Sequence, residues 1–238
     1  MDIKAIFFDL DDTLHDHQKP FSDAIGEMFK NSYRDIAIDS VYKKFRECSD
    51  ILWRNYSNRE LTLEELRIQR ITLALKSFGI NLSNEQASQF QNQYQFCLSN
   101  LELFAQVPEI LEVLNHNGYV LGIITNGPID HQFNKIKTLG LIKYIRRELI
   151  FISDEVGVAK PNPEIFNYVA KKVNFAPEEL LYIGDTWTND IVGAYEAGWQ
   201  SIWYNHRKRL PETELKPLAE IDCLSSLIQV LQKNPSLI

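Results

Sequence analysis

Short apolar segments alternate with longer amphipathic segments along most of the chain. The first, Ile3–Asp9, is rich in Ile and Phe and ends abruptly in acidic residues. Apolar character alone does not separate a buried strand from part of a helix, but the abrupt polar end favours a strand. We predict similar strands at Tyr119–Thr125, Leu149–Ile152, Leu180–Gly184 and Ser201–Tyr204.

Helical patterns with recognisable ends separate these runs. Pro108 lies at one expected helix start, and Gly118 lies where the C-terminal cap of that helix belongs. A second pattern ends at Gly140, and Asn162 with Pro163 opens a third. Strands that alternate with helices of this length predict βαβ units, so the expected fold class is α/β with a parallel sheet covered on both faces.

The stretch from residue 16 to residue 100 breaks this rhythm. It contains no strand-like run, and two of its segments, Thr62–Glu65 and Ser83–Gln86, fit the capping box of a helix start. We predict that residues 16–100 form an all-helical insert between the first and second core strands. Residues 1–15 and 101–238 then form the core.

Composition and charge narrow the possible functions. The 238 residues are 45% hydrophobic and 24% charged, which is typical of a globular domain, and the net charge of -7 argues against nucleic-acid binding. Three cysteines without pairing spacing predict reduced thiols. We find neither a signal peptide nor an apolar stretch of the ~20 residues that span a bilayer. A cytoplasmic protein without membrane contact is therefore expected.

Acidic residues follow the first predicted strand, in the segment Asp9–Thr13. In an extended or gently turning backbone, Asp9 and Asp11 project to the same side. Carboxylates held so close repel each other unless a proton or a cation lies between them. Mg²⁺ suits the position, because it prefers one or two carboxylates together with water and substrate phosphate oxygens. The alternative is an acidic turn or a helix cap.

A second acidic segment follows the strand predicted at Leu180–Gly184. Asp185 lies at the strand end, where ligands of open α/β sheets bind. Asp190 falls in the first turn of a helix expected from Ile191 to Ala197, where its charge also complements the helix dipole. Capping is therefore the alternative role for Asp190.

Two more polar segments complete the set. Thr125 and Asn126 stand between a strand and a helix, where a hydroxyl, an amide and free backbone N–H groups form a cradle for phosphate. Lys160 precedes a turn that Pro161 and Pro163 make rigid, although a lone lysine is usually a solvated surface residue. Each segment follows a predicted strand, so all four are expected at the same edge of the sheet.

Other polar residues are expected to lie outside the site. Arg207, Lys208 and Arg209 form a basic run that is typical of a solvated loop, with a partner surface as the alternative. His15 and His17 follow the first acidic segment and are expected to pack in or solvate a turn, with contact to the substrate from the cap hinge as the alternative.

Taken together, the four segments resemble the signatures of the haloacid dehalogenase superfamily of phosphatases. The match, in order, is D-x-D-x-T at Asp9, Asp11 and Thr13, the threonine at Thr125, the lysine at Lys160, and G-D-x-x-x-x-D at Gly184, Asp185 and Asp190. The resemblance implies a Rossmann-like three-layer core, with residues 16–100 as a helical cap.

The resemblance also implies roles for these residues. Asp9 would attack phosphorus, and Asp11 would protonate the leaving oxygen and then activate water. Thr125 and Lys160 would hold the phosphoryl oxygens. Asp9, the backbone carbonyl of Asp11, and Asp185 would bind Mg²⁺, with Asp190 supporting those ligands.

The function expected from these roles is a magnesium-dependent phosphatase of small phosphorylated metabolites that forms an aspartyl-phosphate intermediate. The segment Ile183–Asn205 is similar to pyrimidine 5′-nucleotidase-like members, which suggests a nucleoside 5′-monophosphate as substrate. Sugar-phosphate phosphatase and phosphomutase are alternatives with the same nucleophile. A 2-haloacid dehalogenase needs neither Mg²⁺ nor the acid at Asp11, and a non-enzymatic binding module would be expected to have lost a catalytic residue. The oligomeric state stays open.

Overall fold

The computed structural model describes residues 2–29 and 37–233. The chain divides into two compact units. Residues 1–16 and 102–238 form one of them, here the sheet unit, and residues 17–101 form the other, here the helical unit. The sequence predicts boundaries after residues 15 and 100, and the role of a cap for the helical unit stays a prediction.

A six-stranded parallel sheet forms the centre of the sheet unit, in the order β3-β2-β1-β4-β5-β6. The strands are β1 (Ala5–Phe8), β2 (Val120–Thr125), β3 (Ile150–Ile152), β4 (Leu180–Gly184), β5 (Gln200–Tyr204) and β6 (Ala219–Ile221). The α/β fold class and the five predicted strands are confirmed. The sequence analysis missed β6, a three-residue edge strand of which only Ile221 is buried, because so short and polar a run carries no apolar signal.

Helices connect the strands of the sheet unit. They are α5 (Val107–His116), α6 (Ile129–Thr138), α7 (Ser153–Val156), α8 (Pro163–Val173), α9 (Gly193–Glu196) and α10 (Ser226–Lys233), with short 3₁₀ turns at Leu141–Lys143, Arg147–Leu149 and Pro177–Glu179. The predicted ends are confirmed. Pro108 lies in the first turn of α5, the Asn162 side chain caps α8 at the N–H of Glu164, and Gly118 and Gly140 follow helices in the left-handed conformation.

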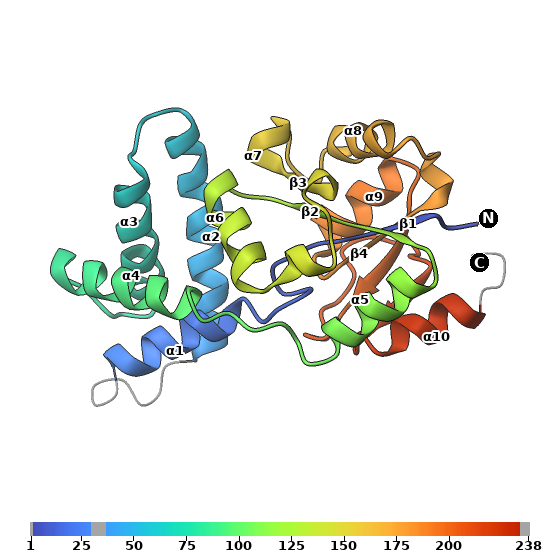
Figure 1. Ribbon diagram of the computed structural model, residues 1–238. Coiled ribbons are helices and arrows are strands. Elements are labelled where there is room, and N and C mark those ends of the chain that lie inside the picture. Colours follow the sequence, from blue (N-terminus) through green and yellow to red (C-terminus); the bar gives the residue numbers. More distant parts are fainter. Residues whose placement is uncertain (1, 30–36, 234–238) are drawn as a thin grey trace. The chain divides into compact units, whose positions relative to one another are not determined.

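Right-handed crossovers put these helices on both faces of the sheet. From β1 the chain adds β2 and then β3 on one side of β1. It then crosses back to add β4, β5 and β6 on the other side of β1. Figure 1 shows α5 on one side of the sheet and α8 with α9 on the other. Phe7 of β1, Phe166 of α8 and Trp199 pack together in the buried core on the α8 side.

The order of the strands reverses between β1 and β4. Because neighbouring connections leave in opposite directions at such a point, a crevice opens at the carboxyl ends of the two strands, and ligands of open α/β sheets bind there. Asp9 directly follows β1, and Asp185 directly follows β4. Their backbones are tied together, since the Asp9 N–H donates to the carbonyl of Ile183 at 2.9 Å.

The helical unit contains α1 (Gln18–Met28), α2 (Ile38–Ser57), α3 (Leu63–Lys76) and α4 (Asn84–Leu98), with no strand among its described residues. Both capping boxes are confirmed by reciprocal hydrogen bonds. Phe21, Phe45, Phe90 and Tyr94 form an aromatic core, and the Arg70 guanidinium lies 4.5 Å above the Phe45 ring. Within the described residues, no helix of either unit is both long and apolar enough to cross a bilayer.

Candidate active site

Three buried carboxylates meet at the reversal point of the sheet. Asp9 follows β1, Asp185 follows β4, and Asp190 lies in the helical turn after β4. One oxygen from each lies within 4.8 Å of the others. The sequence analysis predicted that these residues would gather at one edge, because the carboxyl ends of parallel strands share that edge.

The turn that carries Asp190 differs from its prediction. The sequence predicts a helix starting at Ile191, whereas the structure has a π-helical turn, Trp187–Val192, that runs directly into α9. Asp190 lies inside this turn, and its Oδ2 accepts a hydrogen bond from the Thr186 N–H at 2.8 Å. The wider turn aims the carboxylate back towards β4. Such π-turns occur often at functional sites.

Gly184 makes room for that carboxylate. A Cβ atom at residue 184 would lie only 2.4 Å from Cγ of Asp190. Any side chain at residue 184 would therefore push Asp190 out of the cluster. The close approach explains why a glycine directly precedes Asp185 in the G-D-x-x-x-x-D pattern.

Lys160 lies among these acids rather than in solvent. Its Nζ donates to Asp9 at 2.7 Å, to Asp190 at 2.6 Å and to the Tyr182 hydroxyl at 2.7 Å, which uses all three ammonium donors. The Tyr182 hydroxyl in turn donates to the carbonyl of Ile124 at 2.7 Å. The sequence analysis missed Tyr182, because its position inside an apolar strand suggests only a core residue.

Asn126 holds the backbone of Lys160. Its side-chain Nδ2 donates to the Lys160 carbonyl at 2.9 Å, and its Oδ1 accepts from the Lys160 N–H at 3.0 Å. The sequence predicts that Asn126 binds substrate. Since both polar groups of its side chain bond to Lys160, we expect Asn126 to act on substrate through the loop that it holds.

Burial and charge act on the pKa values of this cluster. Burial raises the pKa of Asp9 to about 7, although Lys160 opposes the rise. Burial also raises the pKa of Asp185 well above its usual value, and the carboxylates of Asp12 and Asp190 add to the rise. For Lys160, burial alone lowers the pKa, but Asp190 and Asp9 outweigh it, so the pKa is raised. The raised pKa values mean that the charged forms of Asp9 and Asp185 are disfavoured unless further positive charge lies beside them.

These residues fit a divalent metal ion. Buried carboxylates with converging oxygens are the ligands that a hard cation such as Mg²⁺ prefers, because like charges held so close repel each other unless a cation lies between them. Asp9 and Asp185 are the predicted side-chain ligands. Asp190 uses one oxygen on Lys160 and the other on the Thr186 N–H, which suits a residue that supports the ligands rather than one that binds the ion.

The basic run after β5 enters the site, contrary to the expectation of a solvated loop. Arg209 Nη1 lies 3.1 Å from Oδ2 of Asp185, and Arg207 Nη2 lies 2.8 Å from Oδ1 of Asp12. The Asn205 side chain fixes the loop, since it bonds to both the N–H and the carbonyl of Arg209. Composition alone could not reveal this placement, because it depends on the loop conformation.

Asp11 has surroundings of its own. The sequence analysis predicted that a proton or a cation lies between the carboxylates of Asp9 and Asp11, and the structure does not test this. Lys135 of α6 donates to both carboxylate oxygens of Asp11, at 2.7 and 2.8 Å, and His15 Nε2 lies 2.9 Å from Oδ1. The left-handed turn at Asp12, with φ of 61°, follows directly. The role of the Asp11 backbone carbonyl as a metal ligand stays a prediction.

Thr125 is buried at the end of β2, where the sequence predicts it. Its hydroxyl oxygen accepts a hydrogen bond from Gln132 Nε2 at 2.5 Å. The following turn is held by Ser153, whose hydroxyl oxygen accepts from the Gly127 N–H at 3.0 Å. Gln132 and Lys135, near this part of the site, were missed by the sequence analysis, and His15 was placed outside the site by it.

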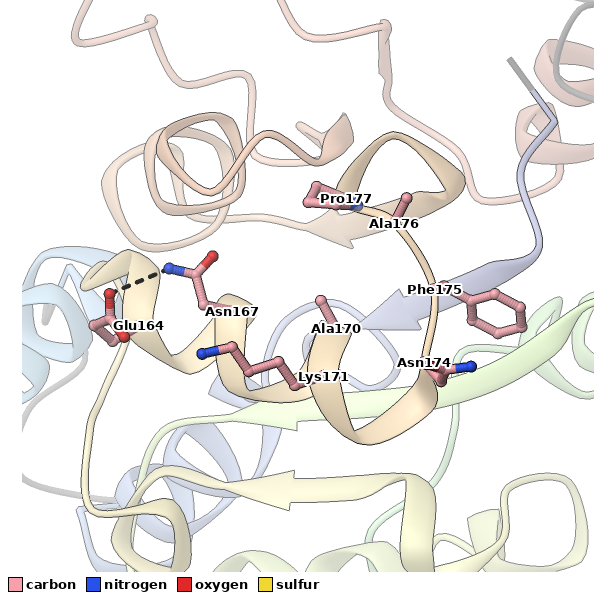
Figure 2. Close-up of a pocket in the computed structure, with 8 residues that line it drawn as sticks. All are labelled: Glu164, Asn167, Ala170, Lys171, Asn174, Phe175, Ala176 and Pro177. Carbon is pink, nitrogen blue, oxygen red and sulfur yellow. Dashed lines mark hydrogen bonds between the residues drawn. The ribbon is translucent and has the colours of Figure 1, made fainter.

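A groove on the outside of the sheet unit lies away from these residues. It is lined by Glu164, Asn167, Ala170, Lys171, Asn174, Phe175, Ala176 and Pro177, as Figure 2 shows. The last of these residues connect the end of α8 with the start of β4. They therefore lie at the amino end of β4, whereas Asp185 lies at its carboxyl end. The groove contains none of the predicted site residues.

Comparison with known proteins identifies the family. Residues 3–198 match the model of the haloacid dehalogenase-like hydrolases. The chain belongs to this family. It is 27% identical to the pyrimidine 5′-nucleotidase PynA of Streptococcus pneumoniae, covering 97% of this chain and 96% of that protein. It is 30% identical to the glyceraldehyde 3-phosphate phosphatase of Pyrococcus furiosus, covering 98% and 94%.

Solved structures agree with this membership. YfnB of Bacillus subtilis, in a magnesium-bound crystal form, has a TM-score of 0.73 at 27% identity and covers 97% of this chain and 99% of that one. Solved 2-haloacid dehalogenases share the fold as well. The resemblance inferred from the four signature segments is confirmed at the level of the family and its α/β fold.

Proposed function

We propose that this hydrolase is a magnesium-dependent phosphatase of small phosphorylated metabolites, in which Asp9 is the nucleophile. The observation that carries the proposal is the position of Asp9 at the reversal point of the sheet. It is buried there beside Lys160, and two further carboxylates complete a cluster suited to a divalent cation. A carboxylate can attack a phosphate dianion only where positive charge offsets their repulsion.

The chain is an enzyme of the phosphoric monoester hydrolase class. Relatives that match nearly its whole length include a 5′-nucleotidase and a phosphatase of a phosphorylated triose. Both classes of substrate share a phosphomonoester and differ in the leaving group. These phosphatase relatives support the catalytic class of the chain, and its substrate is proposed below.

In the first step, an oxygen of Asp9 attacks phosphorus, and the bond between phosphorus and the ester oxygen breaks. Asp11 gives its proton to the departing oxygen, so that an alcohol leaves. Lys160 Nζ, which already contacts Asp9, supports the negative charge of the phosphoryl oxygens, and the Thr125 hydroxyl holds one of them. When bound by Asp9 and Asp185, Mg²⁺ supplies further positive charge at these oxygens.

In the second step, Asp11 accepts a proton from water as that water attacks phosphorus. The bond between phosphorus and the Asp9 oxygen breaks, which releases inorganic phosphate and restores the carboxylate. The covalent intermediate divides one difficult displacement into two easier ones. The same residue serves as acid and then as base, since it loses its proton in the first step and regains one in the second.

A nucleoside 5′-monophosphate is the substrate that we propose first, with a sugar phosphate as the alternative. PynA supports the first and the Pyrococcus furiosus enzyme the second. A phosphomutase would use the same nucleophile but re-use the phosphoenzyme. Dehalogenation is disfavoured because a halide leaves without a proton, which gives the acid at Asp11 no task. We further propose that the protein acts in the cytoplasm and that residues 16–100 form a cap that selects the leaving group.

The test combines metal dependence with a substrate panel. Hydrolysis of p-nitrophenyl phosphate is expected to disappear in EDTA and to return with Mg²⁺. Among nucleoside monophosphates, triose phosphates and hexose phosphates at equal concentration, kcat/KM is expected to be highest for a pyrimidine nucleoside monophosphate. Full activity in EDTA, or metal-free release of halide from a 2-haloacid, would contradict the proposal.

A further inference from the structure

A buried lysine on α6 has no part in the reaction described above. Lys135 is only 4% exposed, and its Nζ bonds to both oxygens of Asp11. Gln132 lies three residues earlier in α6, so both side chains project from one face of that helix. Its Nε2 lies 3.4 Å from Asp11 Oδ2 and 2.5 Å from Thr125 Oγ1.

This arrangement ties the proposed acid to the proposed phosphate-binding threonine. Asp11 is contacted by Lys135 from α6 and by the fully buried His15 from its own loop. The Asp11 side chain nevertheless stays 15% exposed, so that a substrate oxygen can reach it. Charge-assisted, two-point contacts are strong and directional, and they fix the plane of a carboxylate.

Burying an ammonium group costs free energy unless a partner compensates for it. An apolar side chain at residue 135 would be buried without that cost. The free-energy cost of burying the Lys135 ammonium group indicates that its charge has a role at Asp11. Lys135 Nζ lies 2.8 Å or less from both carboxylate oxygens of Asp11.

We propose that Lys135 is a positioning residue, which acts on the leaving group through Asp11. The inference rests on the proposed phosphatase function and deepens it. Hydrogen bonds from Lys135 hold the Asp11 carboxyl group in one orientation, and Gln132 sets that orientation relative to Thr125. In the first step one Asp11 oxygen carries the proton while the other accepts from Lys135. An acid that rotates freely meets the leaving oxygen less often, and small misplacements are costly in rate.

The experiment compares Lys135→Met with Lys137→Met, a control on the exposed side of the same helix. Each variant and the wild type hydrolyse p-nitrophenyl phosphate and n-propyl phosphate with Mg²⁺. Nitrophenolate leaves without help, whereas a propyl alkoxide needs a proton. We expect Lys135→Met to lower kcat/KM for propyl phosphate by about tenfold or more, with the ~10²–10⁴-fold contribution of acid catalysis as the upper bound. It should change kcat/KM for the nitrophenyl ester only slightly.

A double-mutant cycle with Asp11→Asn provides the second readout. If Lys135 acts through Asp11, Lys135→Met has no further effect on propyl phosphate hydrolysis once Asp11 is an amide. Equal losses on both substrates, or a full additional loss in the Asp11→Asn background, would overturn the proposal and leave Lys135 a structural residue. The Lys137→Met control should match the wild type.

Two further measurements keep the outcome decisive. If Lys135→Met fails to fold in a thermal melt, Lys135→Gln, which retains a hydrogen-bond donor, is tested instead, and a smaller loss confined to propyl phosphate is expected. An equal loss on both esters would again overturn the proposal. The wild type and Asp9→Asn report separately on the proposed function. An inactive wild type contradicts the phosphatase, whereas an active wild type with a Lys135→Met loss independent of the leaving group contradicts only the role of Lys135.

Discussion

Asp9 and Asp11 lie two residues apart in the chain, yet the structure gives each carboxylate its own surroundings. Asp9 is buried with two other acids, and its lysine partner, Lys160, comes from a loop. Asp11 is partly exposed, and its partner, Lys135, comes from a helix. The region around Asp9 therefore gathers three acidic side chains, whereas the region around Asp11 pairs one acidic side chain with a lysine.

This difference matches the two tasks that the proposed reaction assigns. A nucleophile reacts faster when it is held in a fixed position, shielded from water, and next to positive charge. An acid and base must exchange a proton with the leaving group and with water, and so it needs partial access. Lys160 has three short partners, which include Asp190 and Tyr182, so its own position is the most tightly fixed in the cluster.

The largest expected effect comes from the buried region. Asp9→Asn should abolish hydrolysis of every phosphomonoester, because an amide cannot serve as the attacking carboxylate. Steady-state assays with p-nitrophenyl phosphate and Mg²⁺ measure the loss, and a thermal melt checks the fold. Turnover by Asp9→Asn at or above that of Asp11→Asn would reverse the assignment of the two carboxylates.

A smaller, substrate-dependent effect is expected from the partly exposed region. Asp11→Asn should lower kcat/KM for alkyl phosphates by ~10²–10⁴-fold, which is the usual contribution of a positioned acid or base. The loss of kcat/KM should be smaller for p-nitrophenyl phosphate, because nitrophenolate departs unprotonated. Measuring kcat/KM for both esters tests this, and unchanged hydrolysis of an alkyl phosphate would remove Asp11 from the reaction.

The smallest effect on catalysis is expected from a change at Tyr182, whose hydroxyl accepts a hydrogen bond from Lys160. Tyr182→Phe removes one of the three partners of Lys160 Nζ and a buried donor to the Ile124 carbonyl. We expect it to lower the free energy of unfolding by about 1–3 kcal/mol, since a buried acceptor loses its partner, and to leave the leaving-group dependence unchanged. Urea unfolding measures the first, and a change in the ratio of kcat for the two esters would argue against a purely supporting role.

Residues that follow strands could be predicted from the sequence. Asp9, Thr125 and Asp185 each lie where an apolar run ends, and the parallel sheet brings such ends to one edge. Lys160 could be predicted because a proline-rich turn follows it. In each case the residue lies where the sequence pattern changes, at the end of an apolar run or before a proline-rich turn.

The residues that the sequence analysis missed do not lie at a local change in the sequence pattern. Lys135 lies within an amphipathic helix, next to the apolar Ile136, and its burial depends on how α6 packs. Arg209 enters the site only because the Asn205 side chain bends the loop after β5. The π-helical start at Trp187 follows from contacts of Asp190 that helix periodicity does not encode.

The most direct test of the account is to trap the covalent intermediate. In Asp11→Asn, p-nitrophenyl phosphate still phosphorylates Asp9, because its leaving group needs no proton, while the loss of the base slows attack by water. Acid quenching during turnover, followed by peptide mass spectrometry, should show one phosphoryl group on the peptide that contains Asp9, and none in Asp9→Asn. Release of nitrophenol with no phosphoryl group on that peptide at any quench time would contradict the assignment of Asp9 as the nucleophile.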